Sequence, residues 1–411
     1  MKKHILVIAQ YFYPEQFRIN DICTEWVKRG YKVTVITGIP NYPKGKYYDG
    51  YGLFKKRKEI YNGVEIIRIP LIPRGKNPIM LALNYLSFVV SGFFWETFTK
   101  LKADYVFIFE VSPMTQALVG VWYAKKKEIP CYLYIQDLWP ENVEIVTGIH
   151  SFAVIEPIKI MVNYIYKNCD HIFATSPSFV DEIRKCCNGT EKQKVTYWPQ
   201  YAEEFYMPVK RNRAVGEVSE IPNDDTFKII FTGNIGQAQG LEILPKAARI
   251  LKDDEDKLKK TVKFVIVGDG RNKGDFETQI KNIGVQDMFV LVGRQPAERI
   301  PAMLGCCDAA FISFMDNELF AKTIPAKLQS YMSCGMPIVA SASGESERVI
   351  NESGCGVCSP IGDLEKLVEK IKLLVELEND LILKMSQKSR EYYERHFDKK
   401  QLMDDIDRYF M

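Results

Sequence analysis

The chain has little histidine and lacks several residue spacings that define common catalytic sites. Of its 411 residues only four are histidines, and they lie far apart, at His4, His150, His171 and His396. This scatter supports no Ser-His-Asp arrangement and contains no His-Glu-x-x-His zinc motif. The sequence also has no Gly-x-x-x-x-Gly-Lys-Ser/Thr loop, so it predicts no P-loop phosphate site.

A strong net charge is also missing. Lys and Arg together number 55 and Asp and Glu 52, which gives a formal net charge of +3. No basic stripe with interleaved aromatic residues stands out, so we expect no nucleic-acid partner. The lone Cys355-x-x-Cys358 has no second pair at zinc-site spacing, so we expect structural thiols, no metal and no cofactor. No signal peptide is visible, and free thiols favour the cytoplasm.

Short apolar runs rich in Val and Ile alternate with helical patterns through the whole chain. Runs of this kind are typical of strands buried on both faces of a parallel sheet, so we predict an α/β fold. The length favours two domains, each doubly wound. We place the first at residues 1–205, a charged linker at 206–226 and the second at 227–388. Two such domains leave a cleft between them, where a ligand is expected.

The most informative stretch begins at Lys322. Lys322, Thr323 and Ile324 form a short loop, and Pro325 is suited to the first turn of a helix that also carries Lys327. The loop is expected to present free backbone N–H groups, a helix-dipole end and two lysines. That combination predicts an anion site, most simply for a diphosphate.

Three further turns in the second half follow predicted strands. Gly233, Asn234 and Gly236 come after one strand, Gly268 after the next, and Arg294 after a third. Glycines at such turns let the backbone approach a phosphate closely. Because parallel strands end at one edge of their sheet, the turns and the Pro325 helix predict a nucleotide site there.

Polar residues also follow the strands of the first half. They are Glu15, Arg18 and Asn20 after the first strand, Asn41 after the second, and Asp137 and Glu141 after the fifth. We expect them to contact a polar substrate. For Asp137 an ordinary role as a loop or helix-capping residue stays open.

One apolar segment, Ile79–Trp95, is shorter than the roughly 20 residues of a membrane span. Basic residues precede it: the cluster Lys55–Lys58, then Arg68, Arg74 and Lys76. The segment could be a buried crossover helix, or it could hold the protein on an anionic membrane surface.

Together these motifs resemble a known family, the GT-B-fold retaining glycosyltransferases of family 4. The resemblance covers nearly the whole chain and rests on motifs in the family's order: Phe231–Gly236, Val267–Gly270, Val292–Arg294 and Cys334–Pro337. Tyr13–Glu15, Pro40–Pro43, Asp137–Glu141 and Ile324–Lys327 are most similar to the branch of the O-antigen N-acetyl-L-fucosamine transferases.

The resemblance implies two Rossmann-like domains that face each other across a cleft, with the tail at about 389–411 packed back on the first domain. It implies a nucleotide-diphosphate sugar, most simply UDP-linked, bound to the second domain. A lipid-linked saccharide acceptor at the inner face of the cytoplasmic membrane is implied for the first. Transfer would retain the anomeric configuration and need no metal.

The chain departs from the family pattern at several positions. The usual E-x7-E pair falls on Lys322 and Ser330, and the usual phosphate-binding Arg and Lys fall near Asn234 and Gln239. We hypothesise that Lys327, Lys322 and Arg294 supply the missing positive charge. Glu345 would replace a glutamate, and Asp137 would orient the sugar or acceptor. The alternatives are a catalytically degenerate partner protein and a nucleotide-sugar 2-epimerase.

Overall fold

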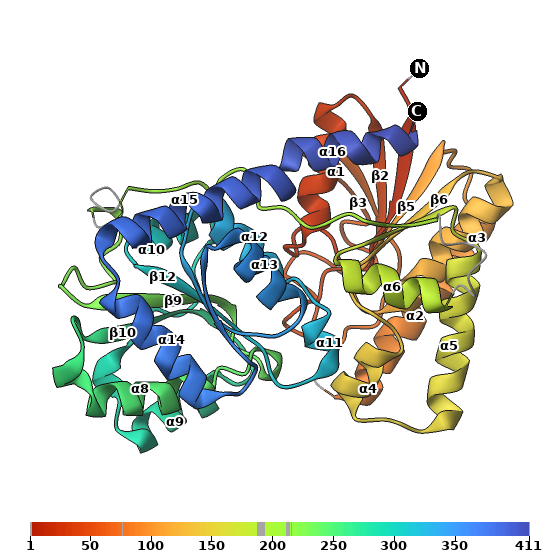
Figure 1. Cartoon of the computed structure of the whole chain (residues 1–411). Helices are drawn as coiled ribbons and strands as arrows, with labels where there is room; N and C mark the ends of the chain where they lie inside the picture. The colour runs from red at the N-terminus through yellow and green to blue at the C-terminus, as the bar shows by residue number, and fades with distance from the viewer. Residues whose placement is uncertain (1, 76, 187–193, 211–213, 215, 411) are drawn as a thin grey trace. The chain divides into compact units, whose positions relative to one another are not determined.

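The computed structural model describes residues 2–75, 77–186, 194–210, 214 and 216–410 (Figure 1). The chain forms two compact units. Unit 1 comprises Met1–Trp198 and Arg408–Met411, and unit 2 comprises Pro199–Asp407. Each unit is a doubly wound α/β domain, which confirms the predicted fold class. Residues 206–226, expected as a linker, group with unit 2, and of the tail only the last four residues group with unit 1.

Unit 1 contains an eight-stranded sheet in the order β3-β4-β2-β1-β5-β6-β7-β8. Every pairing is parallel except β3 with β4. The strands are β1 His4–Ile8, β2 Lys32–Thr37, β3 Lys58–Tyr61, β4 Val64–Arg68, β5 Tyr105–Glu110, β6 Cys131–Ile135, β7 His171–Ala174 and β8 Val195–Tyr197. The antiparallel β3 was not expected, because Lys58 reads as the end of a basic cluster.

The helices of unit 1 connect these strands. They are α1 Arg18–Lys28, α2 Pro78–Phe98, η1 Met114–Gln116, α3 Ala117–Lys127, α4 Glu141–Thr147, α5 Phe152–Lys167 and α6 Pro177–Cys186, with the terminal turn η7 Arg408–Phe410. Phe410 is buried and packs edge-on against Trp26, and its carbonyl accepts a hydrogen bond from the Tyr105 hydroxyl at 2.9 Å. The end of the chain therefore completes the core of unit 1.

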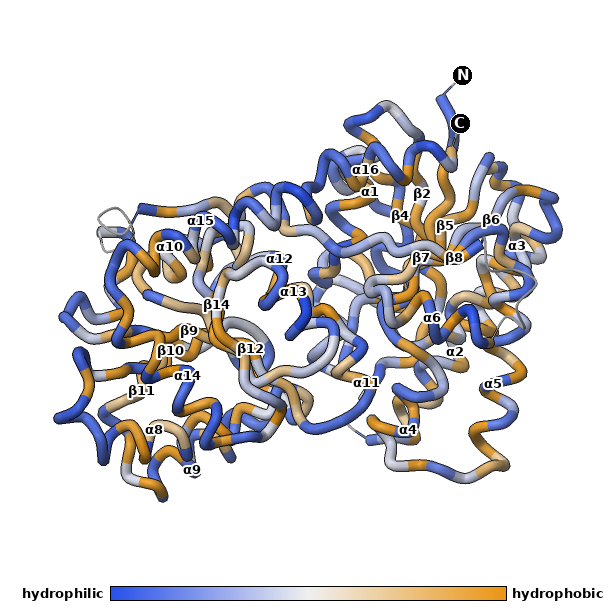
Figure 2. Tube along the Cα trace, in the orientation of Figure 1, coloured by the Kyte–Doolittle hydropathy of each residue, from blue (hydrophilic) through white to orange (hydrophobic). Residues whose placement is uncertain are grey.

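Unit 2 contains a six-stranded, fully parallel sheet in the order β11-β10-β9-β12-β13-β14. The strands are β9 Phe227–Asn234, β10 Val262–Asp269, β11 Phe289–Leu291, β12 Ala309–Ser313, β13 Ile338–Ser341 and β14 Gly356–Ser359. All six strands lie within a few residues of the short apolar runs from which the sequence predicts strands. Figure 2 shows the hydrophobic colour concentrated along the strands, as burial on both faces requires.

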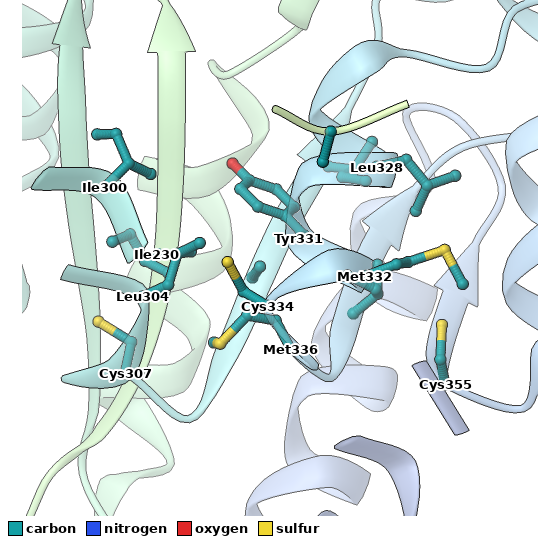
Figure 3. Close-up of a cluster of buried hydrophobic side chains, with 14 of the residues drawn as sticks. Ile230, Ile300, Leu304, Cys307, Leu328, Tyr331, Met332, Cys334, Met336 and Cys355 are labelled. Carbon is teal, nitrogen blue, oxygen red and sulfur yellow. The ribbon is translucent and has the colours of Figure 1, made fainter. Parts of the chain in front are cut away.

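The helices of unit 2 pack on both faces of this sheet. They are η3 Gln237–Gln239, α8 Ile243–Asp253, η4 Glu255–Lys257, α9 Lys273–Ile283, η5 Gln286–Met288, η6 Ala297–Arg299, α10 Ile300–Gly305, α11 Glu318–Ala321, α12 Ala326–Ser333, α13 Glu345–Ser353, α14 Leu364–Glu376, α15 Asn379–His396 and α16 Lys399–Asp407. Leu328, Tyr331 and Met332 of α12 insert into one buried cluster (Figure 3). This packing fixes α12 to the sheet.

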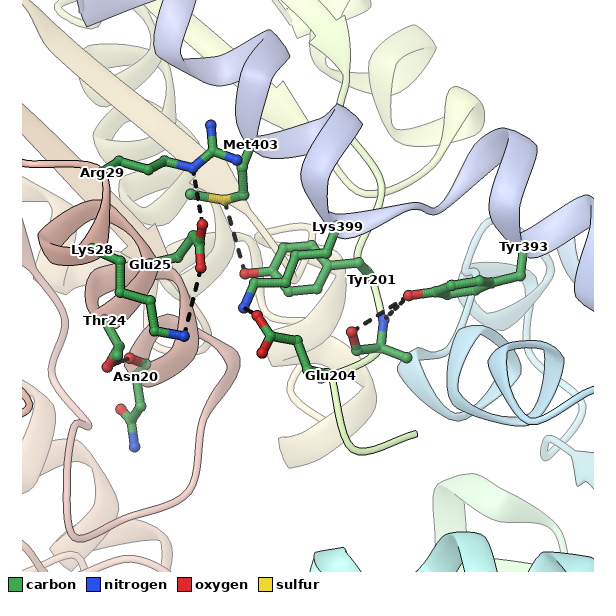
Figure 4. Close-up of polar contacts among 11 residues, drawn as sticks. Asn20, Thr24, Glu25, Lys28, Arg29, Tyr201, Glu204, Tyr393, Lys399 and Met403 are labelled. Carbon is green, nitrogen blue, oxygen red and sulfur yellow. Dashed lines mark hydrogen bonds and ion pairs between the residues drawn. The ribbon is translucent and has the colours of Figure 1, made fainter. Parts of the chain in front are cut away.

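The first residues of unit 2 are fastened to its last two helices (Figure 4). The Tyr393 hydroxyl of α15 accepts a hydrogen bond from the Ala202 N–H at 3.3 Å. Lys399 of α16 forms an ion pair with Glu204 at 2.9 Å, and the Tyr201 hydroxyl contacts the sulfur of Met403. These first residues were expected in the first domain, and side-chain contacts instead hold them to the end of unit 2.

Candidate active site

Each sheet has one point where the strand order reverses direction. In unit 1 this switch lies between β1 and β5, and in unit 2 between β9 and β12. Ligands of open α/β sheets bind beyond the carboxyl ends of the strands at such points. The residues beyond β1, β5 and β6 and those beyond β9 and β12 are therefore the places to look for a site.

Lys327 is the most unusual side chain at the switch point of unit 2. Its amine lies over the Phe231 ring, 4.0 Å from the ring centre, and no carboxylate pairs with it among the described residues. The residue is partly exposed by surface area, but dense protein surrounds the amine, and this burial lowers the pKa of Lys327 to about 7. Such an amine can gain a proton and bind an anion.

The loop before Lys327 differs from expectation. The N–H groups of Lys322 and Thr323 are not free, because they donate to the carbonyls of Leu319 and Phe320 at 3.1 and 3.2 Å. Lys322 caps the short helix α11, Ile324 is buried in the core, and Pro325 is the N-cap of α12 rather than its first residue. The loop's anion-binding capacity therefore rests on the start of α12 and on Lys327.

Close backbone contact surrounds the Lys327 amine. Gly233 has φ +131°, and a Cβ atom there would lie 3.8 Å from the Lys327 amine. Gly268 pairs with Gly233 in the sheet, and a Cβ on Gly268 would lie 1.9 Å from the Gly233 carbonyl oxygen. A side chain at Gly268 is therefore excluded, which leaves only backbone at the paired positions Gly233 and Gly268, one residue before the ends of β9 and β10.

The turn after β9 is closed on itself. The Gln239 side chain accepts a hydrogen bond from the Gly236 N–H at 3.2 Å, and a Cβ on Gly236 would lie 2.6 Å from the Asn234 amide nitrogen. Asn234 and Gln239 therefore shape this turn. Arg294 follows β11 and is exposed. The preceding residue, Gly293, lines a small hollow together with Gly268, Lys273 and Phe276.

Glu345 is the first residue of α13 and is almost fully buried. Its Oε2 accepts hydrogen bonds from the Arg348 guanidinium at 3.0 and 2.9 Å. The next residue, Ser346, donates its hydroxyl to the Thr323 carbonyl at 2.9 Å. The structure therefore brings Glu345 beside the loop that precedes Lys327, with one carboxylate oxygen already engaged.

Several residues expected to bind the acceptor instead join the loops of unit 1. Glu15 is buried, and its Oε1 accepts the N–H groups of Asn41 and Tyr42 at 2.7 and 2.6 Å. Burial raises the pKa of Glu15 to about 7, although these amides oppose the shift. Asn20 donates to the Glu15 carbonyl at 2.7 Å, and Arg18 begins α1.

Asp137 stands at the centre of the other strand-end cluster. Its Oδ2 accepts the Ser112 N–H at 2.8 Å, and the Ser112 hydroxyl accepts the Trp139 indole N–H at 3.0 Å and the Asn142 amide at 2.6 Å. The other oxygen, Oδ1, has no partner in the part of the chain that the structure describes. Asp137 is half-buried, and Glu141 begins the neighbouring helix α4. The cluster thus presents one free carboxylate oxygen.

Two residues near Asp137 were not assigned to the site from the sequence: Glu110 was not singled out, and Arg74 was interpreted only as a basic residue before the apolar segment. Glu110 ends β5 and is fully buried, and its Oε2 accepts the Asp137 N–H at 3.3 Å. Arg74 lies over the Tyr42 ring at 5.3 Å and pairs with no carboxylate among the described residues. Its charge also acts on Tyr85 of α2, as do Asp137 and Glu110. An acid ending the apolar run Tyr105–Phe109 was the readable signal for Glu110.

Helix α2 buries polar residues and exposes apolar ones, the opposite of an ordinary surface helix. It is 21 residues long, longer than the apolar segment read from the sequence, and is apolar enough to cross a membrane by length and composition. Its buried stripe, one residue every four, is Asn84, Phe88, Gly92 and Glu96. Its exposed residues include Ile79, Leu86, Phe93, Phe94 and Phe98, the last 76% exposed. The helix is therefore not a buried crossover helix.

Across residues 2–75, 77–186, 194–210, 214 and 216–410, no group of three His, Cys, Asp or Glu side chains is arranged to hold a metal ion.

Comparison with known families shows which family the chain belongs to. Residues 17–200 match the family described as Glycosyltransferase Family 4, and residues 217–394 match the family described as Glycosyl transferases group 1. The two matches together span nearly all of the chain. The chain is a GT-B glycosyltransferase of group 1 and family 4.

Individual relatives agree with this assignment. The chain is 26% identical over 422 residues to the putative colanic acid biosynthesis glycosyl transferase WcaI of Escherichia coli K12, and the match covers 97% of each chain. Among solved structures, sucrose-phosphate synthase from Thermosynechococcus elongatus superposes with a TM-score of 0.77 at 15% identity, and the match covers 100% of this chain and 98% of that one. HepE from Anabaena in complex with UDP superposes with a TM-score of 0.70 at 13% identity, and the match covers 100% of this chain and 99% of that one. These structural likenesses show the fold.

Proposed function

We propose that the protein transfers a sugar from a nucleotide-diphosphate donor, most simply UDP-linked, to a lipid-linked saccharide during synthesis of a bacterial surface polysaccharide. Transfer retains the anomeric configuration and uses no metal ion. Family membership supports the reaction type. The name of WcaI, a colanic acid glycosyl transferase, supports the polysaccharide, and the UDP bound to HepE supports the nucleotide.

One observation carries the donor half of the proposal: the Lys327 amine is buried against Phe231 without an acidic partner. Burying a cation without a counter-charge costs several kcal/mol, so such an amine needs a reason. A donor diphosphate provides one, because it would supply the counter-charge. As the glycosidic bond breaks, negative charge grows on that diphosphate, and a positioned cation stabilises it.

The remaining donor contacts are assigned around this amine. The backbone of Gly233, Gly236 and Gly268 approaches the phosphates, and Arg294 adds charge from the neighbouring loop. Lys322, Thr323, Ile324 and Pro325 hold the start of α12 in place. Glu345, beside the loop that precedes Lys327, contacts the sugar hydroxyls.

In unit 1 the acceptor is assigned to the Asp137 cluster. Asp137 receives a hydroxyl of the acceptor or orients the sugar, and Glu141 and Arg18 line the approach. Glu15, Asn20 and Asn41 act indirectly by fixing the loops. From the similarity to the N-acetyl-L-fucosamine transferase branch, we propose that the group transferred is an N-acetylated deoxyamino sugar.

The donor assignment is tested by calorimetric titration of the full chain with UDP, GDP, ADP and dTDP in the presence of EDTA. We expect UDP to bind and the others to bind at least tenfold more weakly, a discrimination of about 1.4 kcal/mol. Binding that requires added Mg²⁺ would contradict metal independence. Absence of binding by all four would favour the degenerate partner protein that the missing E-x7-E glutamates also suggest.

We further propose that α2 places the enzyme on the inner face of the cytoplasmic membrane. The helix turns Asn84 and Glu96 inward, where Glu96 pairs with Lys126 at 3.4 Å, and presents phenylalanines outward. Exposed lysines of the Lys55–Lys58 cluster would add attraction to anionic lipids. Aromatic side chains facing solvent over a whole helix surface are typical of a membrane contact.

Cosedimentation with phosphatidylglycerol–phosphatidylethanolamine vesicles tests this contact. Phe94→Asp with Phe98→Asp should release most of the bound protein. Leu383→Asp, which changes an equally exposed residue on α15 of unit 2, is the matched control and should not. Equal sedimentation of both variants and the wild type would contradict the proposal.

A further inference from the structure

Among the described residues of unit 1, Glu110 is a fully buried acid with no cationic partner. Glu110 ends β5 beside the switch point and has no exposed surface. Its Oε1 has no hydrogen-bond partner in the described residues, and its Oε2 accepts only the N–H of Asp137, at 3.3 Å. An ionised carboxylate in such a position costs several kcal/mol.

The charged groups around Glu110 do not offset this cost. The Asp137 carboxylate faces it from the end of β6, and Tyr85 faces both acids from α2. The charge of Arg74, in the loop before α2, acts to lower the pKa of Tyr85 and of Tyr11, which follows β1, but it does not lower the pKa of Glu110. Burial first, and the Asp137 charge second, raise the pKa of Glu110 well above its usual range.

The hydrogen bonds join Glu110 and Asp137 into one unit. The Gln136 N–H donates to the Glu110 carbonyl at 2.8 Å, and the next N–H, that of Asp137, reaches the Glu110 side chain. The Asp137 carboxylate in turn takes the Ser112 N–H, two residues after Glu110. Hydrogen bonds therefore join the ends of β5 and β6 in both directions, and they fix the direction in which the Asp137 Oδ1 points.

We propose that Glu110 is a neutral carboxylic acid that positions Asp137, so that the Asp137 side chain accepts a hydrogen bond from the hydroxyl of the incoming saccharide. This inference rests on the proposed function of the Asp137 cluster. A proton on Glu110 removes the cost of a buried, unpaired negative charge next to Asp137. Ionisation of Glu110 would set the charges against each other and displace the Asp137 loop.

Infrared spectroscopy tests the proton directly, without any need for activity. At pH 7 the spectrum of the wild type minus that of Glu110→Gln should show the carbonyl band of a protonated carboxylic acid, because any band from Glu15, whose pKa is also raised, cancels in the difference. Absence of that band from the difference would overturn the inference. The band together with no transfer from any donor would leave the proton assigned and would instead contradict the proposed function and the role of Asp137.

A pH series tests the positioning role. The acceptor KM of the wild type should rise at alkaline pH, by at most about tenfold per pH unit, as one group ionises. Glu110→Gln, a neutral isostere, should have a KM within about threefold of wild type at pH 7 and should lack the alkaline rise. Glu110→Ala should lose affinity at every pH.

Two results would overturn this role: an unchanged alkaline rise in Glu110→Gln, or a folded Glu110→Gln as impaired at pH 7 as Glu110→Ala. Far-ultraviolet circular dichroism and UDP binding in unit 2 establish that each variant is folded.

Discussion

The two switch-point clusters bury opposite unpaired groups. Among the described residues, the amine of Lys327 in unit 2 lies against Phe231 with no acid paired to it, and the acid Glu110 in unit 1 accepts the Asp137 N–H with no base paired to it. The first arrangement favours an incoming anion. The second leaves one oriented oxygen of Asp137, which favours an incoming hydroxyl. The difference supports our proposal that the phosphate-bearing substrate binds to unit 2 and the sugar acceptor to unit 1.

Other buried charges in the same units show that pairing is the rule. Lys228, fully buried in β9, pairs with Asp224 at 2.6 Å, and the lysine holds the pKa of that carboxyl well below its usual range. Arg68, fully buried in β4, pairs with Glu59 at 2.8 Å. These ion pairs hold the fold together. By contrast, Lys327 and Glu110 form no ion pair among the described residues, so we expect a ligand to bind at Lys327 and a proton to be held at Glu110.

The largest expected effect comes from breaking this contrast at Lys327. Lys327→Met should weaken UDP binding by about 100-fold, equivalent to about 3 kcal/mol, since it removes a charged hydrogen bond to the diphosphate. Transfer should fall at least as far. Calorimetry and a radiolabelled donor measure the two effects, and Lys384→Met on the exposed face of α15 is the control.

Thermal unfolding sharpens the same comparison. Lys327→Met should raise the unfolding free energy by about 1 kcal/mol, because it removes a charge buried without a partner. Lys228→Met should lower the same free energy, since it breaks a paired contact. Equal destabilisation by both substitutions would show that Lys327 is a structural lysine like Lys228.

The next effect concerns the acceptor cluster. Asp137→Asn removes the negative charge at nearly constant shape and should lower kcat for transfer by about 30- to 100-fold, because one polar group that contacts the reacting sugars is weakened. UDP binding should not change, because that site lies in unit 2. Asp181→Asn, on exposed α6, is the matched control. A parallel loss of UDP affinity would contradict the division of roles.

The smallest expected effect concerns Arg74. This guanidinium, held over Tyr42 without a carboxylate partner, is suited to a phosphate of the lipid-linked acceptor. Arg74→Gln should raise the acceptor KM about tenfold with little change in kcat, and Arg74→Lys should recover part of the loss. Steady-state kinetics with varied acceptor measure the split; an effect on kcat alone would assign Arg74 to the chemical step.

Most of the fold could be predicted, because its signals are local. Buried parallel strands such as His4–Ile8 and Ala309–Ser313 are continuous apolar runs, and their lengths appear directly in the sequence. The strand β3 was missed because its pairing with β4 is antiparallel at a sheet edge, where charged residues such as Lys58 and Glu59 are tolerated.

The site could be predicted only in part. Lys327 and Asp137 were identified because charged residues beside strand ends and helix starts are visible in sequence. The hydrogen bonds that occupy the Lys322 and Thr323 amides depend on α11, a one-turn helix with no clear signal. The hydrogen bonds of Glu15, Glu110 and Arg74 join residues that lie 26 to 33 positions apart in the sequence, and sequence spacing does not specify such contacts.

Proton uptake on UDP binding tests the central claim, that the Lys327 amine receives the donor diphosphate. With a pKa of about 7 the free amine is mostly neutral at pH 8, and a bound diphosphate would raise that pKa. Calorimetry at pH 8 in buffers of different ionisation enthalpy should therefore show uptake of nearly one proton, and UDP affinity should fall as pH rises above 7. Lys327→Met should abolish both effects. Binding of UDP without proton uptake, or with the same uptake in Lys327→Met, would contradict the account.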